Sequence, residues 1–118
     1  MKRDDEYLRD WLLEHEAKDD WLFVMPGMTS PSSEDEDKER YHVLLLEDLD
    51  FAKTVARGTF RLTAHAHDYI DAIRSDGIWE KTKAAVAETG GSATLELFKA
   101  VALGFAKQKL EKHTGIEL

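Results

Sequence analysis

Acidic residues are distributed so unevenly along this 118-residue chain that they limit which of its faces can be buried. Residues 1–59 carry 16 acidic and 8 basic side chains, whereas residues 60–118 carry 8 of each, so the whole net charge of −8 lies in the first half. The acids form two clusters, at residues 4–20 and 34–50. Because charged side chains are almost never buried without partners, each clustered segment must keep one face in water.

Both acidic segments have the periodicity of amphipathic helices. Leu8, Trp11 and Leu12 follow the i, i+3, i+4 spacing, which predicts a helix over residues 5–17. Residues 33–36 read Ser-Glu-Asp-Glu, the pattern of a capping box, which predicts a second helix that runs to about residue 49. Its inward face is expected to consist of Tyr41, Leu44, Leu45 and Leu49.

Short β-like runs lie between and after these helices. The apolar run at residues 21–25 is too short for a helix and suits a buried or edge strand. Residues 51–55 and 59–62 flank Ala56-Arg57-Gly58, which predicts a β-hairpin. Helical periodicity then returns, and three further helices are expected at about residues 64–74, 78–88 and 94–112.

The expected order is therefore helix, strand, helix, hairpin and then helices, an α+β fold that is mostly α. A small three-stranded sheet beside helices is the winged-helix arrangement, with the hairpin as the wing. The helix from about Asp35 would stand where a recognition helix usually stands. We expect a winged-helix-like domain over residues 1–75 and a helical extension over residues 76–118, packed on it as a single compact unit.

Several classes of protein are disfavoured by composition. Cysteine is absent, so there is no disulfide framework and no thiolate metal site. No run reaches the ~18 apolar residues of a membrane span, and the first six residues turn acidic at once, unlike a signal peptide. We therefore expect a cytoplasmic protein without a membrane partner.

The chain lacks the residue patterns of a catalytic, metal or cofactor site. His65 and His67 sit two positions apart in a predicted helix, where they point about 200° apart and cannot chelate one ion. Gly90-Gly91-Ser92 precedes a helix, but no lysine follows and no strand precedes it, so we expect an interhelical turn. The paired carboxylates lie on solvated segments, so we expect no enzyme activity, no metal and no cofactor.

The acidic excess instead indicates the chemistry of a partner. Phosphate binding depends on Lys and Arg, so an acidic surface makes nucleic acid an improbable ligand and steers basic partners toward it. We expect a non-enzymatic protein-interaction module that binds a basic protein, such as a nucleic-acid-binding protein whose DNA it imitates. The predicted contact residues are Glu34, Asp35, Glu36, Asp37 and Glu39.

The alternative is a DNA-binding transcriptional regulator of the winged-helix type. Its contacts would come from cations around the second helix and the hairpin, where Arg57 at the tip would reach a minor groove. These cations are Lys38, Arg40, Lys53 and Arg57.

The last predicted helix is the most apolar, and its apolar face is wider than one contact with a small core needs. It would either be buried within the domain or form the seam of a homodimer. The residues expected at such a seam are Leu97, Phe98, Val101 and Phe105.

Five segments resemble a family of uncharacterised bacterial and phage proteins, the domain of unknown function 2513 family. The resemblance is strongest at Arg61-Leu62-Thr63 and continues through Ala66–Arg74 and Ile78–Lys81, with earlier matches at Met1–Asp4 and Arg40–Leu46. It implies a winged-helix-like fold and a bacterial or phage origin. It brings no catalytic residues, because the family has no established activity.

Overall fold

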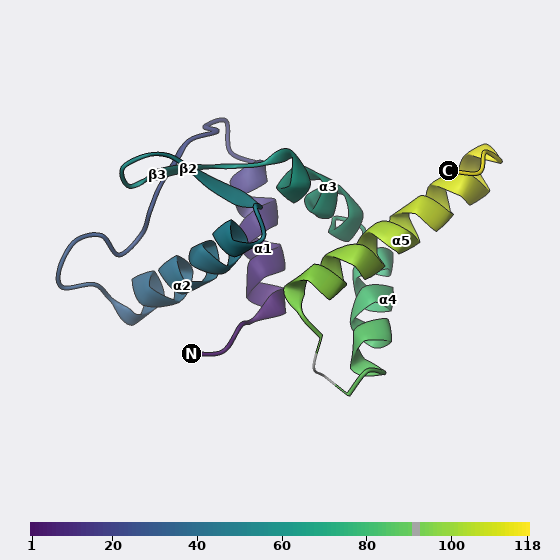
Figure 1. Cartoon of the computed structure of the whole chain (residues 1–118), viewed down its shortest axis with the longest axis horizontal. Helices are drawn as coiled ribbons and strands as arrows, with labels where there is room; N and C mark the ends of the chain where they lie inside the picture. Colours follow the sequence, from purple (N-terminus) through teal and green to yellow (C-terminus); the bar gives the residue numbers. More distant parts are fainter. Residues whose placement is uncertain (91–92) are drawn as a thin grey trace. The chain divides into compact units, whose positions relative to one another are not determined.

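A computed structural model describes residues 1–90 and 93–118 as an α+β protein that is mostly helical. The helices and strands follow the expected order of helix, strand, helix, hairpin and helices (Figure 1). They are α1 (Asp5–Glu16), β1 (Phe23–Val24), α2 (Glu34–Asp48), β2 (Ala52–Ala56), β3 (Thr59–Leu62), α3 (Ala64–Ile73), α4 (Asp76–Ala87) and α5 (Leu95–Thr114). The predicted fold class is confirmed. Of the predicted turn before the last helix, Gly91 and Ser92 lie outside the described residues.

The chain divides into two compact units, Met1–His67 and Asp68–Leu118. The expected boundary, after residue 75, assigned the whole of α3 to the first part. In the structure the division falls inside α3, because this continuous helix carries the chain from one unit into the next. We call the two parts the N-terminal and the C-terminal unit.

The first two helices begin at side-chain caps. The Asp4 carboxylate accepts a hydrogen bond from the Tyr7 N–H at the start of α1, at 3.0 Å. At α2, Ser33 and Glu36 accept from each other's backbone N–H, so the predicted capping box is confirmed. Such caps stabilise a helix by about 1 kcal/mol each, since they satisfy backbone N–H groups that have no partner within the helix.

The sheet is antiparallel, in the order β1-β3-β2. Strands β2 and β3 form the predicted hairpin, in which Gly58 takes a positive φ of 72° at the turn. Strand β1 is an edge strand of two residues that pairs Phe23 with Phe60. The strand expected over residues 21–25 is shorter than predicted, since the exposed Trp21 and Leu22 precede the paired residues.

The N-terminal unit is built around apolar residues from α1, α2 and the sheet. These buried side chains are Leu8, Trp11, Leu12, Val43, Leu46, Phe51 and Phe60. The inward face predicted for α2 was wrong by about one position around the helix, because Leu44 is 43% exposed while His42, Val43 and Leu46 are buried. His42 lies within the buried stripe, and a polar residue there hides the i, i+3, i+4 pattern.

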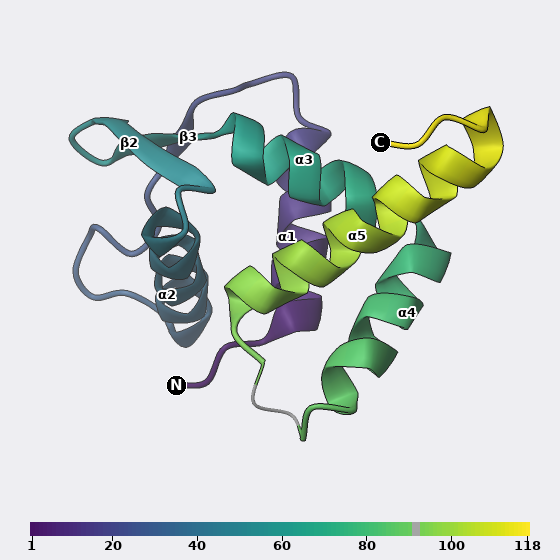
Figure 2. The ribbon, with the colours of Figure 1, turned by 45° about the vertical axis from the view of Figure 1, so that its right-hand side comes forward.

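In the C-terminal unit, helices α4 and α5 pack against each other (Figure 2). The Trp79 and Phe98 rings lie 5.9 Å apart, and both are buried. Helix α5 ends as predicted at Gly115, whose φ of 71° allows its N–H to reach the Glu111 carbonyl. Among the described residues, no helix combines the length and the apolar character that crossing a bilayer requires.

Candidate functional site

The five predicted partner-binding acids play different parts in the structure. Glu34, Asp35 and Asp37 are exposed in the first turn of α2, and we call these three residues the acidic patch. Glu36 is engaged in the capping box. Glu39 is half-buried and accepts a 2.9 Å hydrogen bond from Trp11 Nε1, which ties α2 to α1.

Of the four cations proposed for DNA, one is engaged within the protein and three are exposed. Lys38 forms a 3.3 Å ion pair with Asp4 and lies 4.6 Å above the centre of the Tyr7 ring. The Tyr7 N–H, helped by Lys38, lowers the pKa of the Asp4 carboxyl. The remaining three are exposed: Arg40, whose Nη1 lies 3.5 Å from the Gly27 carbonyl oxygen, and Lys53 and Arg57 on the hairpin.

Of the four residues proposed for a dimer seam on α5, one is buried within the C-terminal unit. Phe98 is buried against Trp79, so it belongs to the core of the C-terminal unit and is not available to a second copy. Leu97 is 38% exposed, and Val101 and Phe105 are half-buried. These three lie four residues apart and share one stripe of the helix.

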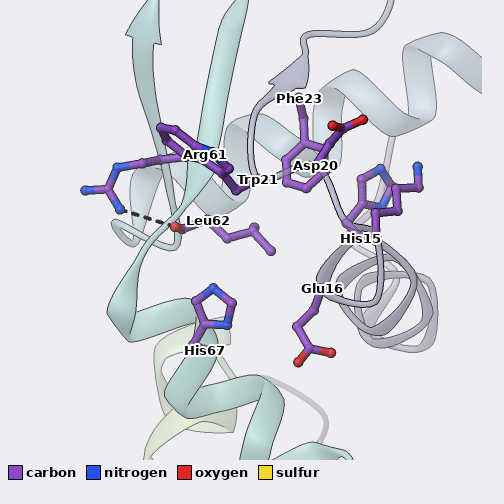
Figure 3. Close-up of a pocket in the computed structure, with 9 residues that line it drawn as sticks. His15, Glu16, Asp20, Trp21, Phe23, Arg61, Leu62 and His67 are labelled. Carbon is purple, nitrogen blue, oxygen red and sulfur yellow. Dashed lines mark hydrogen bonds between the residues drawn. The ribbon is translucent and has the colours of Figure 1, made fainter.

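A cleft of about 370 Å³ lies in the N-terminal unit and was not anticipated from the sequence (Figure 3). It is lined by His15, Glu16, Lys18, Asp20, Trp21, Phe23, Arg61, Leu62 and His67. Figure 3 shows His15 and Glu16 on one side of the hollow, Leu62 on the other, and His67 directed into it. We call it the His15 cleft.

His15 is the most constrained polar group of this cleft, with 9% of the residue exposed. Its ring stacks on Trp11 at 3.8 Å and meets the Phe23 ring edge-on at 5.1 Å. Its Nδ1 lies 2.9 Å from the Trp11 carbonyl oxygen. Because a carbonyl only accepts, Nδ1 must carry the proton, and in the neutral ring Nε2 is then an acceptor.

Burial keeps this ring in its neutral form. Removal from water lowers the pKa of His15, and the nearby Lys18 adds to the effect, although the hydrogen bond to Trp11 and the carboxylates of Glu39 and Glu14 oppose it. Near neutral pH the Nε2 lone pair is therefore present. Within residues 1–90 and 93–118 it meets no hydrogen-bond partner.

His42 shows the contrasting case in the same unit. Its Nδ1 lies 2.8 Å from the carbonyl oxygen of Lys38, four residues earlier, just as His15 Nδ1 meets Trp11. Its Nε2, however, accepts a 2.9 Å hydrogen bond from the Asp4 N–H. His42 is thus a satisfied structural histidine, whereas Nε2 of His15 is open to water.

The other side chains of the cleft define its charge. Lys18 and Arg61 oppose Glu16 and Asp20, of which Glu16 is half-buried and Asp20 is exposed. Of the two histidines at the start of α3, His67 lines the cleft and His65 does not. Over the described parts of the chain, no group of three or more His, Asp or Glu side chains is placed to hold a metal ion.

The architecture is that of a small, mostly helical α+β protein with a three-stranded sheet in its N-terminal unit. A family model described as "Hypothetical protein (DUF2513)" matches residues 2–92. The match covers more than half of the chain, which therefore belongs to this family. Helix α5 lies beyond the matched residues. No curated protein and no solved structure matches the sequence.

Proposed function

We propose that this chain is a non-enzymatic, winged-helix-like interaction module that binds a basic protein partner through the acidic patch. One observation carries the proposal: Glu34, Asp35 and Asp37 are exposed on α2, whereas the neighbouring Lys38 is engaged with Asp4 and Tyr7. The negative charge of the patch therefore faces solvent, and Lys38 does little to neutralise it because it pairs with Asp4. In keeping with this chemistry, we propose a cytoplasmic protein of bacterial or phage origin.

Helix α2 also supports the comparison with a winged helix. It precedes the β2–β3 hairpin and packs against β2, which is where a recognition helix stands relative to its wing. In a DNA-binding protein the first turn of that helix would meet phosphates. Three exposed carboxylates there would repel them, and would attract the Lys and Arg residues of a protein that itself binds nucleic acid.

The test is a titration with a lysine- and arginine-rich peptide, followed by fluorescence anisotropy at low and moderate salt. Neutralising the patch with Glu34→Gln, Asp35→Asn and Asp37→Asn should weaken binding about tenfold or more, since three charge contacts are lost. The control carries Glu88→Gln, Glu96→Gln and Glu117→Gln, three exposed acids of the C-terminal unit. It changes net charge equally and should bind within about twofold of the natural chain.

Equal weakening in both variants would show that only overall charge matters, and this would reject the patch as the binding surface. Binding that does not weaken with salt would also contradict the proposal, because attraction between exposed charges is screened over about 10 Å at 0.1 M.

A second candidate, a DNA-binding regulator, is favoured by one observation: Lys53 and Arg57 are both exposed on the hairpin, at the place of the wing. A labelled DNA duplex in the same assay separates the two functions. If the hairpin binds DNA, the duplex binds at low salt and Arg57→Ala weakens it, whereas neutralising the acidic patch strengthens it.

A second copy of the chain is the partner we propose for α5. The stripe of Leu97, Val101 and Phe105 is only partly covered in the structure, and a homodimer would bury it.

A further inference from the structure

A second hollow lies in the C-terminal unit, between the second half of α3, the start of α4 and the second half of α5. It is an open groove of about 850 Å³, more than twice the volume of the His15 cleft. Its lining includes the buried Ala72 and Ile78, and Leu110 adds an apolar side chain that is 49% exposed. We call this hollow the α5 groove.

The helices that line the α5 groove bring opposite charges to it. Asp68 and Asp71 line it from α3, and Lys109 and Lys112 line it from α5. All four side chains are exposed. Among the described residues no ion pair joins the two helices here, since Asp71 pairs with Arg74 at 3.2 Å and the other three have no ion-pair partner. The groove therefore keeps opposite charges apart, and one occupant can pair with both.

The size and spacing of the groove favour a helix as that occupant. Its volume is near the upper end of the range of small-molecule pockets, and because it is open, a small ligand would leave much of its own surface in water. The aspartates on α3 are three residues apart, and so are the lysines on α5. Side chains on the flank of a bound amphipathic helix recur at the same spacing, while its apolar face lies in the groove.

The charges also limit which helix fits. A uniformly basic helix would be repelled by the lysines of α5, and a uniformly acidic helix by the aspartates of α3. Helix α5 of a second copy is a poor match as well, because Lys107 and Lys109 make it basic on both sides of its exposed Leu110. The complementary helix carries both signs of charge, one on each flank.

We propose that the α5 groove binds an amphipathic helix of a protein partner, with basic residues along one flank and acidic residues along the other. The basic flank lies along the aspartates of α3, the acidic flank lies along the lysines of α5, and the apolar face packs on Ile78 and Leu110. The groove belongs to the C-terminal unit and includes no residue of the acidic patch, so this inference does not depend on the proposed function.

The test uses two labelled peptides of about 18 residues, long enough to form a helix, with leucines every three or four positions. The mixed peptide has lysines on one flank and glutamates on the other, and the acidic peptide has glutamates on both. Fluorescence anisotropy on the full chain should show the mixed peptide binding about fivefold or more tightly than the acidic one. Neutralising the acidic patch with Glu34→Gln, Asp35→Asn and Asp37→Asn should leave binding of the mixed peptide unchanged.

A change of specificity tests the charges on α3. Asp68→Lys with Asp71→Lys makes both sides of the groove basic, so the acidic peptide should bind about tenfold more tightly than it binds the natural chain. The control, Glu88→Lys with Glu117→Lys, changes net charge equally at exposed positions outside the groove. It should strengthen binding less than about twofold. Because the first variant gains a ligand, a folding defect cannot imitate the result.

The apolar contact is tested by Leu110→Ser, which should weaken the mixed peptide about tenfold. Ile116→Ser, an exposed position outside the groove, should leave binding unchanged.

Four results would overturn the proposal. They are no binding of the mixed peptide at about 1 mM, equal binding of the two peptides to the natural chain, an equal gain in the charge variant and its control, and dissociation of a sedimenting dimer by the mixed peptide, which would make a second copy the occupant. None of them alters the result with the basic peptide at the acidic patch, so the two proposals can be judged separately.

Discussion

Replacement of Glu39 by methionine should destabilise the N-terminal unit by about 2 kcal/mol. Trp11 is 5% exposed, and its indole N–H donates to the Glu39 carboxylate at 2.9 Å. A hydrogen bond to a charged group contributes about 1.5–3 kcal/mol, and an unpaired buried donor costs a similar amount. Methionine keeps the length of the side chain and its helix propensity but offers no effective acceptor.

Glu39→Gln is the matched control, because its amide oxygen still accepts from Trp11 while the charge is removed. We expect this variant to lose less than about 1 kcal/mol. Urea unfolding followed by tryptophan fluorescence measures both values, and the N-terminal unit contributes Trp11 and Trp21 to the signal. If both variants lie within about 0.5 kcal/mol of the natural chain, water satisfies the indole N–H and the link between α1 and α2 is not a stabilising one.

Two further outcomes can be measured on the same protein. The pKa of His15 is lowered from 6.5 in the fold, so the unfolded chain binds the extra proton more readily, and stability should fall as the pH drops below about 6.5. His15→Phe should flatten this part of the stability profile measured by urea unfolding. If α5 forms a homodimer, Leu97→Glu should shift sedimentation to the monomer, and Lys107→Glu, an exposed control on the same helix, should not.

The elements with local signals were predictable from the sequence. The capping box at Ser33 and Glu36, the hairpin around Gly58 and the αL stop at Gly115 each depend on residues within a few positions of one another. Helix α2 shows the limit of such signals. The hydrophobic pattern predicts that Leu44 faces inward, but the buried position is held by His42. A histidine can be buried there because its Nδ1 is hydrogen-bonded to the carbonyl of Lys38 in the same helix.

The site was less predictable because its contacts are distant in sequence. Lys38 looks like a free cation in a helix, but its partner Asp4 lies 34 residues away. The His15 cleft combines the end of α1, the segment at Trp21, strand β3 and the first turn of α3. No local pattern links these segments, and the exposure of Trp21 is visible only after β1 has paired with β3.

The two buried histidines, His15 and His42, make the same local hydrogen bond but differ at their second ring nitrogen. Each donates from Nδ1 to the carbonyl four residues earlier, an interaction that any histidine in a helix can make. The fate of Nε2 depends on a long-range neighbour: the Asp4 N–H satisfies His42, while no backbone or side-chain group in the described residues reaches Nε2 of His15. The two rings therefore differ only at Nε2, which is satisfied by the backbone in His42 and is open to water in His15, since no fully buried side-chain nitrogen or oxygen in the described residues lacks a partner.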